Sequence, residues 1–387
     1  CVWGLKTVEI DGTYHTIGRG AFSGCSFEEF TIPDSVTWID EYAFDQSNIK
    51  RVYGGNNIRT IGRAAFADTD LEYFEIPEAL ETLGSFAFAG VNLTEVVFHD
   101  KLVEVGYQVF NYSKIKRAVI SEAIAHLSDK LFVNCFDLET VVIGGAVESI
   151  GEKVFESCTA LETVIIPSNV TEISDNAFLD ANEDVVIYCN EGSYAQQYAI
   201  ANDIKYTTLV IDPIENQVYT GEEITPEVKA SANNRRLTQD TEYTVSYKDN
   251  INAGSAKVIA KGLGDFKHLV ATAKFTILPK DAAEVRALNT GSVYSPKGVI
   301  PEIYVFSGSN RLVQGQDYEI LENSVLKDAG EYNIAVSLIG NYDGVVNIVY
   351  KISRKPIAKT NIEYGNTVKI TYQGVTLEEG KDYTVIK

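Results

Sequence analysis

Hydrophobic positions recur at a fixed period through the first half of the chain. A phenylalanine returns every 22 residues five times and then every 23 residues twice, at Phe22, Phe44, Phe66, Phe88, Phe110, Phe132, Phe155 and Phe178. An aliphatic residue stands five positions before each phenylalanine, from Ile17 to Ile173. A fixed period of 20–30 residues predicts stacked rungs and not a globule with a single core. Any function is then expected on a long exposed face rather than in a cleft.

Residues 161–178 show what one rung contains. The segment Val164–Ile166 is β-branched and precedes Pro167, so we predict a short strand that ends there. Val164 and Ile166 should point inward, while Thr163 and Ile165 should point outward. Pro33 and Pro77 should end the strands of their rungs in the same way. The Ala-Phe element should lie in a helical or 3₁₀ turn that returns the chain.

The repeated pattern L-x-x-V-x-I-P-x-x-V-x-x-I-x-x-x-A-F-x-x-C resembles the BspA-like (Treponema-type) leucine-rich repeat over about residues 1–206. Gly54, the sequence Phe86-Ala-Phe88 and Val109 depart from the pattern locally. The resemblance implies a bacterial cell-surface or secreted protein that attaches to host proteins or to other cells. The segment Gly192–Asn202 should form a capping helix, with Tyr194, Ala195, Tyr198 and Ala201 on its apolar side.

After about residue 206 the period disappears and alternating strands follow. Tyr219 to Tyr243 and Tyr294 to Tyr318 are both 24 residues apart, which indicates a duplicated unit. Several short strands separated by Gly, Asn and Asp turns are typical of β-sandwiches, and these units resemble small bacterial immunoglobulin-like repeats. We therefore predict a leucine-rich-repeat solenoid at 1–206, immunoglobulin-like modules at 207–279 and 280–354, and a partial third module at 355–387.

The acidity is confined to the first half. Residues 1–206 hold 32 acidic and 13 basic side chains, which account for most of the net charge of −21. Such a field disfavours nucleic acid and favours basic partners, although high solubility alone also explains it. No segment approaches the length of a membrane span, so we expect no membrane insertion in this part of the protein.

Cysteine and histidine do not indicate catalysis. Cys135 and Cys158 lie on adjacent rungs, where a disulfide is sterically conceivable, but we favour buried free thiols in the turn layer. Cys1 either fills the same place in its rung or is a lipid anchor. We find no nucleophile motif, no phosphate-binding loop and no metal-ligand spacing, so we expect no enzyme activity, no metal and no cofactor.

The outward strand positions form two columns that could bind a ligand. Arg51, Tyr53 and Tyr73 cluster in the first half of this face, and Tyr and Arg dominate interface energies. An apolar stripe from Val97 to Ile165 follows, and it either binds a partner or is covered by flanking side chains. The candidate ligand-binding residues are Glu29, Arg51, Tyr53, Tyr73, Glu75, Glu95, Arg117, Val119, Val142 and Ile165.

These observations favour a non-enzymatic surface or secreted binding and adhesion protein. The solenoid would hold a protein or glycan of a host or a neighbouring cell, and the immunoglobulin-like modules would form a stalk. Two alternatives are a purely structural spacer and the non-catalytic, substrate-binding part of a secreted enzyme.

Overall fold

The computed structural model describes residues 7–8, 13–289, 291–295, 297–321, 324–354, 361–363, 369–372, 374–379 and Tyr383. Contacts divide the chain into two compact units, of which unit 1 holds residues 1–213, 228–246 and 258–273, and unit 2 holds 214–227, 247–257 and 274–387. The predicted module 207–279 contributes to both units, and the predicted domain boundaries stay a prediction. Cys1 lies outside the described residues.

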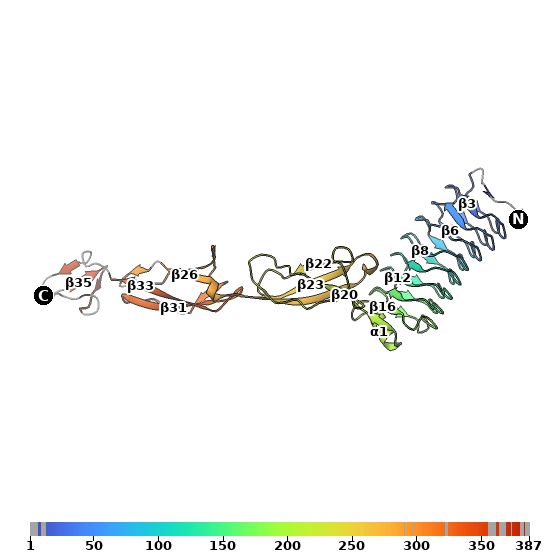
Figure 1. Ribbon diagram of the computed structural model, residues 1–387. Helices are drawn as coiled ribbons and strands as arrows, with labels where there is room; N and C mark the ends of the chain where they lie inside the picture. The colour runs from blue at the N-terminus through green and yellow to red at the C-terminus, as the bar shows by residue number, and fades with distance from the viewer. Residues whose placement is uncertain are drawn as a thin grey trace. The chain divides into compact units, whose positions relative to one another are not determined.

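Unit 1 contains the solenoid, in which every rung except the fourth carries a first strand that belongs to a parallel sheet (Figure 1). We number the rungs 1 to 8 by the phenylalanine with which each ends, from Phe22 to Phe178. One sheet has the order β1 (Thr7–Val8), β3 (Glu29–Ile32), β5 (Arg51–Gly54). A second sheet joins β8 (Glu95–Val97), β10 (Arg117–Val119), β12 (Thr140–Val142), β14 (Thr163–Ile165), β16 (Val186–Tyr188) and β17 (Lys205–Thr207).

Each rung also has a second, two-residue strand that the sequence analysis did not predict. These strands end at the aliphatic residues five positions before each phenylalanine and form two further parallel sheets. The first is β2 (Thr16–Ile17), β4 (Trp38–Ile39), β6 (Thr60–Ile61), β7 (Thr82–Leu83) and β9 (Glu104–Val105). The other is β11 (His126–Leu127), β13 (Ser149–Ile150) and β15 (Glu172–Ile173).

The phenylalanines form a continuous column inside the solenoid. Phe66 is fully buried, and its ring stacks between Phe44 at 5.0 Å and Phe88 at 5.3 Å, both at an interplanar angle of 3°. Aromatic pairs of this kind add about 0.5–1.5 kcal/mol each beyond the burial of their area. The column therefore fixes the register that the sequence period predicted.

The prediction of a helical or 3₁₀ return turn is wrong. The Ala-Phe segments are chains of hydrogen-bonded turns, in which the Phe66 N–H donates to the carbonyl of Ala87 on the next rung at 2.9 Å. Ala64 and Asp68 on either side have φ of +51°, a left-handed conformation that no 3₁₀ helix contains. Hydrogen bonds that alternate within and between rungs satisfy the backbone N–H and C=O groups of these segments, so the turn layer needs no helix.

The predicted capping helix is confirmed as α1 (Tyr194–Ala201), which lies beside β16 at the end of the solenoid (Figure 1). The hydroxyl of Ser193 caps it by accepting a bond from the Gln196 N–H at 3.3 Å. Ala195 and Tyr198 are buried as expected. Tyr194 and Ala201 are exposed, so their assignment to the apolar side was wrong.

The segments 207–279 and 280–354 share one strand order, which supports the predicted duplication. In 207–279 the two sheets are β18 (Val210–Ile211), β20 (Ala230–Ala232), β21 (Arg235–Arg236), and β19 (Gln217–Val218), β24 (Val270–Leu278), β23 (Gly254–Gly262), β22 (Tyr243–Lys248). In 280–354 they are β26 (Val285–Asn289), β28 (Ile303–Ser307), β29 (Asn310–Arg311), and β27 (Ser292–Val293), β33 (Val345–Ser353), β31 (Gly330–Leu338), β30 (Tyr318–Ile320).

Smaller elements complete the described chain. They are the pair β25 (Lys280–Asp281) and β32 (Tyr342–Asp343), the 3₁₀ turns η1 (Gly264–Phe266) and η2 (Ala282–Glu284), and the sheet β34 (Asn361–Glu363), β35 (Lys369–Tyr372), β36 (Val375–Thr376). The last sheet holds the described part of the predicted third module. No helix within the described residues is long and apolar enough to cross a membrane.

Candidate ligand-binding face

The outward face of the first-strand sheets divides into an open part and a covered part. Period-2 alternation places Glu29, Arg51, Tyr53, Tyr73, Glu75 and Glu95 at exposed positions on rungs 2 to 5. Arg117 and Val119 on rung 6 are half-buried. Val142 and Ile165 are only 1% and 2% exposed, so the prediction that they belong to an exposed stripe is wrong.

The segment that follows the solenoid covers Val142 and Ile165. Both belong to a buried cluster with residues from strands and loops more than 40 positions later, namely Leu209, Ala230, Ala232, Leu237, Tyr243, Ala260 and Leu269. Val119 and Tyr188 pack against the same cluster. The part of the apolar stripe from Val119 to Ile165 thus has an intramolecular partner within unit 1, and burial of its area accounts for the apolar residues at these outward positions.

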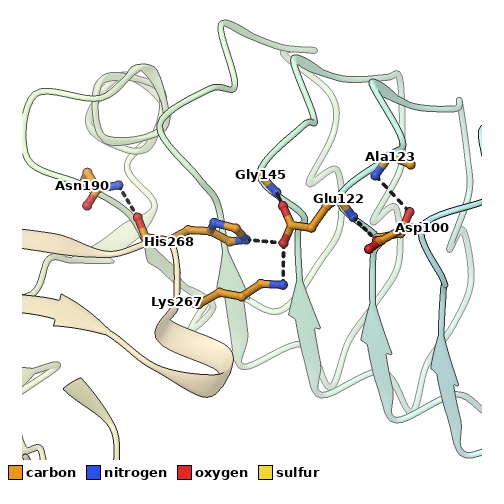
Figure 2. Close-up of polar contacts among 8 residues, drawn as sticks. Asp100, Glu122, Ala123, Gly145, Asn190, Lys267 and His268 are labelled. Carbon is orange, nitrogen blue, oxygen red and sulfur yellow. Dashed lines mark hydrogen bonds and ion pairs between the residues drawn. The ribbon is translucent and has the colours of Figure 1, made fainter. Parts of the chain in front are cut away.

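Polar contacts border the covered part. The Glu122 carboxylate accepts bonds from the Lys267 ammonium and from the Gly145 N–H at 2.6 Å, and it lies 3.0 Å from the His268 imidazole (Figure 2). Asn190 donates to the carbonyl of His268 at 2.8 Å. The loop at 264–268 is therefore held by Glu122 of rung 6 and by Asn190, which follows the last rung.

Burial and these contacts shift the pKa values of Glu122 and His268. Burial opposes ionisation of Glu122, but the bonds from Lys267 and Gly145 outweigh it and hold the pKa of Glu122 below its ordinary value. Burial also lowers the pKa of His268, against the opposing pull of Glu122. The imidazole is therefore harder to protonate in the folded protein than in the unfolded chain.

The open part carries an aromatic pair among charged side chains. The rings of Tyr53 and Tyr73 lie 5.6 Å apart and are 40% and 41% exposed. The Tyr73 hydroxyl donates to the Glu75 carboxylate at 2.8 Å, which raises the pKa of Tyr73. Arg51 lies 3.3 Å from Glu29, so its charge is partly neutralised from the rung below. The open part thus offers flat aromatic surface and acceptor oxygens.

The parallel sheet is interrupted between rungs 4 and 5. Tyr73 bridges back to Arg51, but within the described residues no backbone hydrogen bond joins 73–76 to β8 on the next rung. A groove of about 750 Å³ opens at this break, between 72–78 and 93–99. Its volume lies in the range of small-ligand sites, about 300–1,000 Å³. We call it the rung 4–5 groove.

Carboxylates dominate the rung 4–5 groove. Glu72, Glu75, Glu78 and Glu95 line it, and His99 is its one titratable nitrogen among the described lining residues. Arg51 and Arg117 approach Glu72 and Glu95 from neighbouring rungs, at 4.0 and 2.8 Å. Glu75 and Glu78 have no ion-pair partner in the part of the chain that the structure describes. The groove therefore presents a negative potential next to the Tyr73 ring.

Cys135, Cys158 and Cys189 are buried free thiols, as we expected for the first two. Cys135 and Cys158 donate to the carbonyls of Phe110 and Phe132 at 3.0 and 3.1 Å. Burial raises the pKa of Cys135 to about 12 and that of Cys189 to about 11. No group of metal-ligating side chains is found among the described residues.

A match to a known protein family agrees with the architecture of the solenoid. Residues 2–116 and 59–185 match the BspA type leucine rich repeat region, in six copies. No curated protein matches the sequence. With the rungs described above, the family match identifies this half of the chain as a leucine-rich-repeat solenoid.

Several solved structures are similar over part of the chain. A leucine-rich repeat protein from Eubacterium ventriosum is 21% identical, covers 42% of this chain and 56% of its own, and has a TM-score of 0.34. The Treponema pallidum leucine-rich repeat protein is 24% identical, with coverages of 40% and 78% and a TM-score of 0.36. A leucine-rich cell surface protein from Faecalibacterium prausnitzii is 25% identical, with coverages of 51% and 63% and a TM-score of 0.35. The chain thus spans less than two thirds of the E. ventriosum protein.

Proposed function

We propose that this chain is part of a bacterial surface or secreted binding protein of the BspA-like, Treponema type, non-enzymatic, and that its ligand binds the open face on rungs 2 to 5. The segments after the solenoid would be immunoglobulin-like and would act as a stalk. The match of residues 2–185 to BspA-type repeats supports a surface role. The proposal that the ligand binds this part of the face rests on the rung 4–5 groove.

The groove favours an extended, basic segment of a partner protein. Lys and Arg side chains would pair with Glu75 and Glu78, which have no ion-pair partner among the described residues, while a cation near the Tyr73 face gains about 0.5–1 kcal/mol at an exposed site. Within the part of the chain that the structure describes, the backbone of 74–76 makes no interstrand hydrogen bond on the groove side, so it can bond an extended peptide. The following segment covers Val142 and Ile165 on rungs 7 and 8 and so removes them from the candidate surface.

Binding to peptide and glycan arrays tests the proposal, and the full chain is the appropriate probe. A fragment ending at residue 206 would uncover Val142 and Ile165 and bind nonspecifically. We expect retention of Lys- and Arg-rich extended peptides by the full chain and loss of retention when Tyr53 and Tyr73 are both replaced by Ala. The melting temperature should change little, because both side chains lie on the surface outside the core of the solenoid.

Charge variants distinguish binding in the rung 4–5 groove from a general attraction to the negative charge of the solenoid. Glu75→Gln with Glu78→Gln should weaken peptide capture severalfold, whereas Glu148→Gln with Glu172→Gln removes the same charge from exposed sites elsewhere and should not. Equal loss in both pairs would mean that net charge alone attracts the peptide. No retained partner at all would favour the spacer alternative.

A further inference from the structure

The two segments after the solenoid each place the same short element against the part of the chain that precedes them. The element is Gly264-Asp265-Phe266 in 207–279 and Gly340-Asn341-Tyr342 in 280–354. Each follows a nine-residue strand, β23 or β31, and precedes another, β24 or β33. We call it the Gly-Asx-aromatic loop.

The first Gly-Asx-aromatic loop contacts the solenoid within unit 1. The Asp265 carboxylate accepts from the Arg117 guanidinium at 2.6 Å. The ring of Phe266 lies 5.8 Å from that of Tyr188. Lys267 and His268, the next two residues, hold Glu122 (Figure 2). The loop thus uses one polar and one aromatic contact.

The second loop repeats this scheme within unit 2. Asn341 accepts from the Ala253 N–H at 2.7 Å through Oδ1 and donates to Oδ1 of Asn252 at 3.0 Å through Nδ2. The ring of Tyr342 meets that of Tyr219 edge to face at 5.6 Å. The receiving surface is therefore the turn at Asn252-Ala253 together with Tyr219.

The duplication places an equivalent surface on segment 280–354. Asp328 and Ala329 correspond to Asn252 and Ala253, because Ala329 precedes Tyr342 by the same 13 residues by which Ala253 precedes Phe266. Tyr294 corresponds to Tyr219, because each lies 24 residues before the next tyrosine of the repeat. Ala329 is exposed, and its N–H has no hydrogen-bond partner within the described residues. The Asp328 carboxylate has no hydrogen-bond or ion-pair partner there either, so an acceptor and a donor stand side by side as in the occupied copy.

We propose that Asp328 and Ala329 form a docking site for the Gly-Asx-aromatic loop of a further module of this kind, joined after segment 280–354. The site favours Asn over Asp in that loop. An Asn amide can donate to Asp328 and accept from the Ala329 N–H, whereas an Asp would bring two carboxylates together. The inference is independent of the proposed ligand-binding face.

Amide hydrogen exchange in an extended chain tests this site. Residues 279–353 are repeated directly after Ser353, in place of 354–387, which preserves the natural spacing between modules. Exchange of the Ala253 amide provides the internal reference, because Asn341 already bonds it. We expect the Ala329 amide to exchange about tenfold more slowly in the extended chain than in the parent chain.

Two substitutions in the added copy make the test specific. The change equivalent to Asn341→Ala should return Ala329 to its parent rate and leave Ala253 protected. The change equivalent to Asn347→Ala, at an exposed strand position, should leave Ala329 protected. Equal Ala329 exchange in the parent and extended chains, or protection that survives the first substitution, would overturn the proposal.

Discussion

Replacing Leu269 with Ala should loosen the segment that covers rungs 6 to 8. Leu269 is fully buried in the cluster with Val142 and Ile165, and it directly precedes β24. Deleting a buried leucine side chain of this kind costs about 2–5 kcal/mol, because transfer energy is lost and a cavity remains. Its backbone bonds to Gly262 and Phe266 do not involve the side chain.

The matched control is Leu278→Ala at the other end of the same strand. Leu278 is 42% exposed, so its truncation should cost less than about 0.5 kcal/mol. Hydrogen exchange followed by mass spectrometry measures the free energy of local opening in peptides covering 228–246. A dye that binds exposed apolar surface should also bind more strongly to the Leu269 variant, because Val142 and Ile165 become accessible to it.

Comparing the two variants tests whether the cluster around Leu269 holds the covering segment in place. A decrease of about 2–5 kcal/mol in the opening free energy for Leu269→Ala, with almost none for Leu278→Ala, is the expected result. Similar small effects in both would refute the conclusion that the apolar stripe is held by this cluster.

Three further outcomes follow from buried or titrating groups. Phe66→Ala should destabilise the solenoid by about 3–5 kcal/mol in urea unfolding, and the exposed Phe136→Ala by less than about 1 kcal/mol; equal effects would contradict the stacked column. Because the pKa of His268 is lowered in the folded state, the unfolded chain takes up its proton first, so stability should fall as the pH falls through about 6.5, and His268→Gln should flatten this slope in melting curves. Cys135, Cys158 and Cys189 should resist a thiol reagent at about pH 8 until denaturant is added, as mass mapping would show, because burial raises their pKa values.

The solenoid could be predicted from the sequence because its contacts are periodic. Residues such as Phe66 and Phe88 meet their own equivalents one rung away, so the spacing alone specifies the packing. The short second strands were missed although part of their signal was present: an aliphatic residue, such as Ile61 in Thr60–Ile61, precedes each phenylalanine by the same interval. The turn layer was mistaken for a helix because the left-handed residues Ala64 and Asp68 are not glycine.

The candidate face was only partly predictable. Alternation identified the outward positions, including Tyr53 and Tyr73, because it is a local property of a strand. The cover over Val142 and Ile165 comes from Leu209 to Leu269, and nothing in the spacing of the rungs specifies such a distant contact. The break between rungs 4 and 5 has no signal in the sequence, where the 22-residue register continues unchanged.

Hydroxyl-radical footprinting of the full chain tests the division of the face most directly. We expect rapid oxidation of Tyr53, Tyr73 and Val97 on the open rungs, and strong protection of Val142, Ile165 and Leu269 beneath the following segment. Oxidation of Val142 and Ile165 at rates comparable to Val97 would show that rungs 7 and 8 are uncovered, and would contradict the account.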